Sequence, residues 1–150
     1  MADKKPYPTY QSESDDDRNI VREPYIAWEL QDAASKISRG LYTDILITIQ
    51  SRLKLTNLEL AELLQLSPRT LDRRRKEVTL PADESERSYR IARLTELAMQ
   101  VFEDQDKVSA WFTQPNFALG NQKPLDLIKS EPGARLVERL LHQIEHGITV

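Results

Sequence analysis

The chain has no cysteine among its 150 residues, only 4 glycines, and an aromatic share of 7%. The missing thiols exclude disulfides, Cys-ligated zinc, iron–sulfur clusters and thiol nucleophiles together. The few glycines, with no Walker or dinucleotide fingerprint, argue against a nucleotide-binding sheet protein. No stretch approaches the roughly 18 apolar residues of a membrane span, and residues 1–22 have no apolar signal-peptide core. We therefore expect a cytoplasmic protein without a cofactor.

The charge is unevenly distributed along the chain. The formal net charge is −3, but residues 36–90 hold 11 basic and 8 acidic side chains, a local charge of +3, between flanks of −4 and −2. The densest basic run is Arg73-Arg74-Arg75-Lys76. Phosphates respond to a local basic patch even in an acidic protein. This run is therefore the candidate for contact with nucleic acid.

Apolar residues recur with helical spacing from Gln31 onward, and no segment alternates like a strand, so the sequence predicts an all-α fold. Thr56 and Glu59 form a capping box at the start of one helix, and Ser67 caps the next one, with a proline at its first position. Ser130 is the expected cap of the last helix, and Gly147 ends it. Further predicted apolar faces comprise Leu41, Ile45, Ile49 and Leu53; Ile91, Leu94, Ala98 and Val101; and Leu136, Val137, Leu140, Leu141 and Ile144.

Three regions are predicted from these patterns. Residues 1–30 form a flexible acidic segment, because prolines and the run Asp15-Asp16-Asp17 give low hydrophobicity and no period. Within this segment, Pro24 to Trp28 is where the chain is expected to dock first. Residues 31–82 form a helix-turn-helix DNA-binding module, and residues 83–150 form a small helical domain.

The basic run lies on the last helix of the predicted helix-turn-helix, the one that Ser67 caps. Leu71 is spaced to face the core, which turns the basic side chains outward. We expect Arg69, Thr70, Arg73 and Arg74 to face base edges in the major groove. Arg75 and Lys76 are expected to neutralise phosphates. The alternative is a solvated basic helix face without a ligand.

The C-terminal part carries a series of motifs in a fixed order. They are Trp111, Pro115-Asn116, Leu119-Gly120, Pro124-Leu125-Asp126-Leu127, Gly133 and His146-Gly147. This series resembles the C-terminal domain of the Xre/MbcA/ParS antitoxins, and the predicted helix-turn-helix resembles the Xre-like module of the same family. The resemblance covers roughly residues 41–150.

The resemblance implies a type II antitoxin. Such a protein binds operator DNA through its first module and a cognate toxin through its second. The usual toxin has a RES domain and consumes NAD⁺; the antitoxin occludes its active site, and the complex represses its own operon. We expect a homodimer within a higher-order toxin–antitoxin complex, with recognition helices about 34 Å apart.

Two features of the C-terminus are candidates for the toxin contact. Arg135 and Arg139 are four residues apart and share one helix face. Gly147-Ile148-Thr149-Val150 is a largely apolar tail that would fit a partner's cleft. The alternatives are a solvated helix face and a frayed terminus. Trp111, Phe112 and Leu125 are expected to be local core.

Residues 142–146 spell His-x-x-Glu-His, the inverted zinc-protease pattern. These are the only 2 histidines in the chain, and no upstream carboxylate is marked as a further ligand, so we expect no metal. No serine has a nucleophile-elbow context and no carboxylate cluster stands apart from solvated helix faces, so we expect no catalysis. Two other functions remain open. One is a stand-alone transcription regulator whose C-terminal part dimerises or senses a ligand. The other is a DNA binder without sequence preference, for which competition binding would give a specificity ratio near one.

Overall fold

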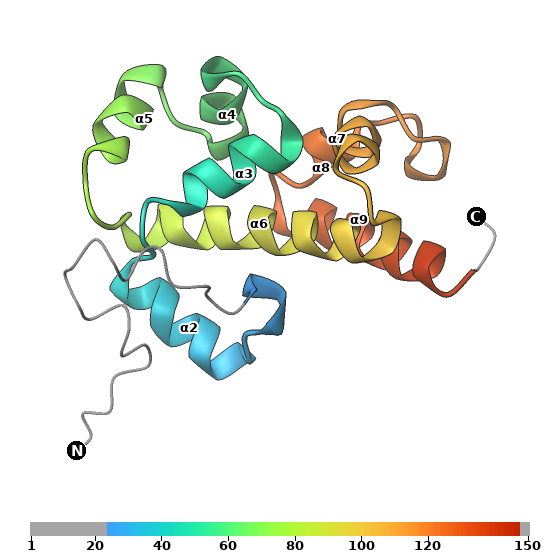
Figure 1. Ribbon diagram of the computed structural model, residues 1–150, viewed down its shortest axis with the longest axis horizontal. Helices are drawn as coiled ribbons and strands as arrows, with labels where there is room; N and C mark the ends of the chain where they lie inside the picture. Colours follow the sequence, from blue (N-terminus) through green and yellow to red (C-terminus); the bar gives the residue numbers. More distant parts are fainter. Residues whose placement is uncertain (1–23, 148–150) are drawn as a thin grey trace.

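A computed structural model of the chain describes residues 24–147. These residues form helices joined by short loops, with no strand among them, so the all-α prediction is confirmed. Figure 1 shows the arrangement. The elements are η2 (Tyr25–Ala27), α2 (Leu30–Arg39), α3 (Ile45–Leu53), α4 (Asn57–Leu64), α5 (Pro68–Arg75), α6 (Ala82–Phe102), α7 (Gln105–Thr113), η3 (Phe117–Leu119), α8 (Pro124–Leu127) and α9 (Glu131–Glu145).

The 21-residue helix α6 runs through the middle of the molecule. Helices α3, α4 and α5 lie on one side of it, and η2 and α2 lie on the opposite side (Figure 1). Helix α6 contacts α2, α3, α7 and α9. Among residues 24–147, no helix has both the length and the apolar character needed to cross a bilayer.

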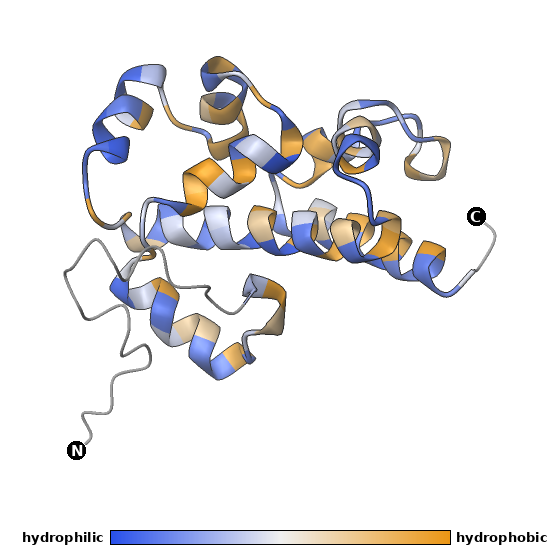
Figure 2. Ribbon diagram, viewed as in Figure 1, coloured by the Kyte–Doolittle hydropathy of each residue, from blue (hydrophilic) through white to orange (hydrophobic). Residues whose placement is uncertain are grey.

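The buried apolar side chains form one cluster rather than two. Ile45 of α3, Ile91 of α6, Phe112 of α7 and Val137 of α9 all belong to it, each with an exposure of 0%. Four apolar residues of α3 are buried, namely Ile45, Leu46, Ile49 and Leu53. Helix α5, in contrast, is almost wholly hydrophilic (Figure 2). The predicted boundary near residue 82 therefore falls at the start of a helix that both regions share.

The N-terminal segment docks earlier than its predicted flexibility over residues 1–30 implies. Tyr25 and Trp28 are buried, and the Trp28 ring stacks on Tyr89 of α6 at 5.7 Å between centroids. The Nζ of Lys36 lies 3.9 Å from the centre of the Trp28 ring. Burial of these rings holds residues 25–28 on the core. Docking at Pro24–Trp28 is thus confirmed. The predicted flexible segment, residues 1–30, should not include these docked residues. Residues 1–23 lie outside the described part.

The predicted caps are confirmed, and two predicted apolar positions differ. Leu41 is buried but precedes α3, because its N–H donates to Ser85 Oγ at 2.8 Å and its carbonyl accepts the N–H of Leu80 at 2.9 Å. Gly40, with φ +97°, allows this close approach: a Cβ there would lie 2.5 Å from the Leu80 oxygen. Leu136 of α9 is not in the core, since 45% of it remains exposed.

Candidate functional site

Helices α4 and α5, with the turn between them, form the helix-turn-helix. The capping box at Thr56 and Glu59 begins α4. Gln65, with φ 61°, ends it in the left-handed region, and Ser67 Oγ accepts the N–H of Thr70 at 3.0 Å to begin α5. Leu71 is 1% exposed and attaches α5 to the core. The opposite side of α5 consequently faces solvent.

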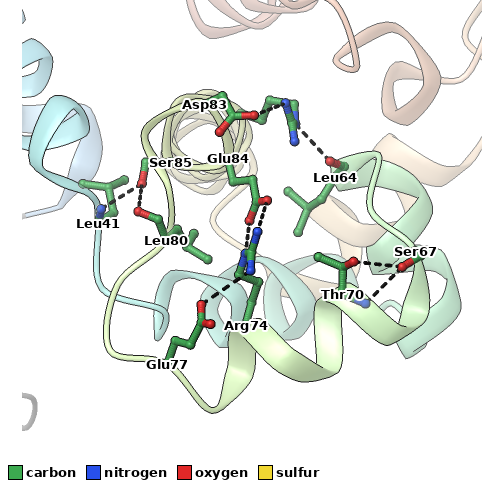
Figure 3. Close-up of polar contacts among 11 residues, drawn as sticks. Leu41, Leu64, Ser67, Thr70, Arg74, Glu77, Leu80, Asp83, Glu84 and Ser85 are labelled. Atoms are coloured by element: carbon green, nitrogen blue, oxygen red, sulfur yellow. Dashed lines mark hydrogen bonds and ion pairs between the residues drawn. The ribbon is translucent and has the colours of Figure 1, made fainter.

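Three basic side chains of α5 and its C-terminal end are exposed, namely Arg69, Arg73 and Lys76. None of the three has an ion-pair partner within residues 24–147. Thr70 is half-buried, and its Oγ1 accepts a hydrogen bond from Ser67 Oγ at 3.0 Å (Figure 3). The structure thus presents three cations in the direction expected for DNA contact, and that contact stays a prediction.

Arg74 does not face outward as expected. Its Nε donates to Glu84 Oε1 at 2.6 Å and its Nη2 donates to Glu84 Oε2 at 2.8 Å, a two-pronged pair between α5 and α6 (Figure 3). Nη1 also lies 3.6 Å from a carboxylate oxygen of Glu77. The side chain is only 14% exposed. The planar guanidinium matches a carboxylate in two places at once, and this match turns Arg74 toward the protein.

Arg75, which was expected to neutralise phosphate, is half-buried between two other helices. Its Nη2 donates to Gln50 Oε1 at 2.7 Å and to Asn57 Oδ1 at 2.8 Å. The guanidinium therefore ties the C-terminal end of α5 to α3 and to the first turn of α4. Of the two residues assigned to phosphates, Lys76 alone is exposed.

Polar contacts join the C-terminal ends of α3 and α4 to the later helices α6 and α7. Arg87 of α6 donates from Nε to the carbonyl of Leu64, at the end of α4, at 3.0 Å. Ser109 of α7 donates from Oγ to the carbonyl of Leu53, at the end of α3, at 3.0 Å. These contacts satisfy carbonyls that a helix end leaves without an intrahelical partner.

The residues expected to contact a toxin lie on α9 and after it. Arg135 and Arg139 are both exposed, and Arg135 also pairs with Glu131 one turn earlier. Gly147 follows the helix with φ +73°, as expected for its end, and residues 148–150 lie outside the described part. Helix α9 is attached to α6 by Arg93, whose Nη2 donates to Glu138 Oε2 at 2.8 Å.

Two groups of residues singled out in the sequence remain: those expected in the local core and the two histidines. Phe112 is fully buried, and Trp111 and Leu125 pack against the same core, as expected. His146 Nδ1 lies 2.8 Å from the carbonyl oxygen of His142. Within residues 24–147, no three or more of the His, Cys, Asp and Glu side chains form a group that would hold a metal.

Sequence reasoning missed one feature of the C-terminal half. Phe117 of η3 is 87% exposed. In the sequence, Phe117 lies between the motif elements Pro115-Asn116 and Leu119-Gly120, and no role was predicted for it. Exposure in a loop follows no helical period, so no pattern of apolar spacing identifies it.

The fold and site place the chain among helix-turn-helix proteins that carry a small C-terminal helical domain on the same core. Residues 32–93 match the Xre-like helix-turn-helix domain of antitoxins. Residues 97–147 match the domain described as the Xre/MbcA/ParS C-terminal toxin-binding domain. The chain belongs to the Xre/MbcA/ParS family of antitoxins.

Similar proteins come from several bacteria. Antitoxin Xre of Pseudomonas putida is 30% identical over 114 residues, which cover 75% of this chain and 70% of that protein. Antitoxin Xre of Yersinia enterocolitica is also 30% identical over 114 residues, covering 75% and 77%. A chain of the M. tuberculosis MbcT–MbcA toxin–antitoxin complex is 24% identical with a TM-score of 0.59, over 72% of this chain and 96% of that one, and has a similar fold.

Proposed function

We propose that the chain is a type II antitoxin that neutralises a cognate RES-domain toxin and represses its own operon. The observation that carries the proposal is the match of residues 97–147 to a toxin-binding domain, on the same core as a helix-turn-helix with exposed basic side chains. The proposed mechanism is non-catalytic, because the antitoxin covers the active site of an NAD-consuming enzyme. It acts in the cytoplasm, where the toxin's substrate is present.

The DNA-binding half uses the exposed side of α5. Arg69, Thr70 and Arg73 lie toward the N-terminal and central part of the helix, where side chains of a recognition helix meet base edges. Lys76 neutralises a phosphate at the other end. Arg74 and Arg75 hold the helix in place through the contacts described above. In a homodimer, two such helices enter successive major grooves of an operator about 34 Å apart.

The toxin-binding half uses the C-terminal domain. Arg135 and Arg139 offer exposed guanidinium groups from α9. The segment Gly147-Ile148-Thr149-Val150, which follows α9 in the sequence, offers the apolar residues Ile148 and Val150. Together they remain the proposed contacts to the toxin, with the basic groups pairing acidic side chains and the apolar tail entering a cleft.

The experiment expresses the reading frame next to this gene with and without this chain. Toxicity, a fall in cellular NAD⁺ and rescue by this chain are expected, together with co-purification of the two proteins. Arg73→Ala should weaken operator binding and leave rescue intact, whereas deletion of residues 148–150 should do the reverse. Lys107→Ala, which removes an exposed cation on α7, is the matched control.

Two results would reject parts of this proposal. A neighbour that is neither toxic nor co-purified would favour a stand-alone transcription regulator. Equal damage to both activities by Arg73→Ala and by the tail deletion would show that the two surfaces do not act separately. Toxicity with unchanged NAD⁺ would retain the antitoxin and exclude the RES class.

A further inference from the structure

We propose that Phe117 is the apolar anchor through which the C-terminal domain binds its toxin. The inference rests on the proposed function and names a residue within it. The partner's chemistry is a protein surface with a hydrophobic pocket sized for one aromatic ring. This contact is distinct from the basic face of α9 and from the C-terminal tail.

Phe117 is exposed in a way that the fold does not explain. It is 87% exposed, whereas every other aromatic residue within 24–147 is buried or half-buried. The nearby rings of Phe102, Trp111 and Phe112 contact one another, at centroid distances of 5.7 and 5.2 Å. No ring of another described residue pairs with Phe117. Single exposed apolar side chains are ordinary on protein surfaces, so the exposure of Phe117 gains meaning from its aromatic ring, its fixed loop and its place in the domain.

Hydrogen bonds fix the loop that presents this ring. Asn116 Oδ1 accepts the N–H of Ala118 at 2.9 Å, and the Asn116 carbonyl accepts the N–H of Asn121 at 2.8 Å. The Asn116 N–H donates to the carbonyl of Gln122 at 3.0 Å, which closes the loop at its base. Gly120 and Asn121 adopt positive φ of 69° and 62° to make this turn. The backbone is therefore ordered before a partner arrives, which lowers the entropy lost on binding.

The position of Phe117 points to the toxin rather than to DNA. Within residues 97–147, which match the toxin-binding domain, Phe117 and Leu136 are the exposed large apolar side chains among the described residues. Helix α9, which carries Leu136, packs against η3. Leu136 follows Arg135 in the sequence, and consecutive helical positions point about 100° apart, so the two side chains lie on different sides of α9. Aromatic side chains are enriched at protein–protein interfaces and among the residues that dominate their binding energy.

The test compares two equally exposed apolar residues in the full chain. Phe117→Ala removes the anchor, and Leu30→Ala removes a side chain that is 86% exposed on α2, outside the matched toxin-binding domain. Binding to the purified protein encoded by the adjacent reading frame is measured by calorimetry. Phe117→Ala should weaken binding about tenfold or more, and Leu30→Ala should leave it unchanged. The melting temperature and the affinity for the promoter fragment should stay unchanged in both.

The outcomes separate this inference from the function on which it rests. If the wild-type chain binds and Phe117→Ala binds as tightly, the anchor is wrong and the antitoxin function stands. If the wild-type chain does not bind the protein encoded by the adjacent reading frame, both the Phe117 anchor and the antitoxin function are wrong. If Phe117→Ala turns a wild-type dimer into a monomer in light scattering, the ring serves a second copy of this chain and the inference is overturned. Phe117→Trp should keep tight binding and change its fluorescence as the ring becomes buried, and a Phe117→Trp chain without that change would contradict burial.

Discussion

Arg74 and Glu84 join helix α5 to the first turn of α6 through two parallel hydrogen bonds of 2.6 and 2.8 Å. Their side chains are 14% and 10% exposed. The helix that meets DNA in the proposed function is thus held by the helix that also supports α7 and α9. A cation in the middle of the basic run has a structural partner that lies ten residues away.

Removal of one member of this pair should destabilise the fold. Arg74→Ala leaves the Glu84 carboxylate nearly buried without its partner, and we expect a loss of about 2–4 kcal/mol in the free energy of unfolding. Arg73→Ala, at an exposed position one residue away, should change it by no more than about 0.5 kcal/mol. Denaturant unfolding measures both. The double variant Arg74→Ala/Glu84→Ala should lose less than the sum of the single losses; additive losses would show that the pair is not coupled.

The two cations at the end of α5 should differ in their response to salt. Lys76→Ala should lower the slope of the logarithm of operator affinity against the logarithm of salt concentration by about 0.9, which is the loss of one phosphate contact. Arg75→Ala should leave the slope nearly unchanged and lower the melting temperature, because Gln50 and Asn57 lose their donor. If Arg75→Ala lowers the slope as much as Lys76→Ala does, Arg75 contacts phosphate in the complex after all.

The pair between Arg93 and Glu138 should make stability fall in acid. The hydrogen bond from Arg93 holds the pKa of Glu138 below its usual value. The stabilisation is therefore complete above the usual glutamate pKa of about 4.3 and is lost as the pH falls through the lowered value. Glu138→Gln should be less stable than the wild type at pH 7, and the difference should shrink as the pH falls below 4. A constant difference across that range would exclude this linkage.

Glu96 should show the opposite dependence on pH. Its Oε1 accepts the N–H of Ile26 at 2.9 Å, and burial raises its pKa above the usual value. The contribution of a raised pKa is complete below about pH 4.3 and is lost as the pH rises through the raised value. Glu96→Gln keeps an acceptor for Ile26 and removes the charge, so its stability relative to wild type should improve from pH 4 to pH 7 in thermal melts. Glu96→Ala, which removes the acceptor, controls for the lost hydrogen bond.

The parts of the fold that depend on interactions between residues close in the sequence were predicted. A cap is a contact between residues three positions apart, so Thr56 with Glu59, and Ser67 before its proline, were found without the structure. The side-chain direction of Leu71 followed from spacing, and with it the outward direction of Arg69 and Arg73. These predictions needed no knowledge of how the helices pack.

The parts that depend on distant partners were not predicted. Arg74 turns inward because Glu84 meets it from another helix, and helical spacing on α5 alone contains no information about that carboxylate. Docking near Trp28 was predicted, but its partner was not: the ring of Tyr89, 61 positions later in the numbering, stacks on Trp28. Leu136 is exposed although it fits an apolar period, since α9 buries only the stripe that faces α6. Tertiary packing decided each of these positions.

The helix-turn-helix depends on contacts with α6, which begins at the domain boundary expected near residue 82. A chain ending at residue 82 lacks Glu84 for Arg74 and Arg87 for the Leu64 carbonyl. It also exposes the face of α3 that packs on α6 and α7. We expect residues 1–82 to show no cooperative thermal transition by circular dichroism, while the full chain melts cooperatively. A cooperative melt of residues 1–82 near the full-chain temperature would support independent folding of the first module. Its absence would place α6 inside the helix-turn-helix unit.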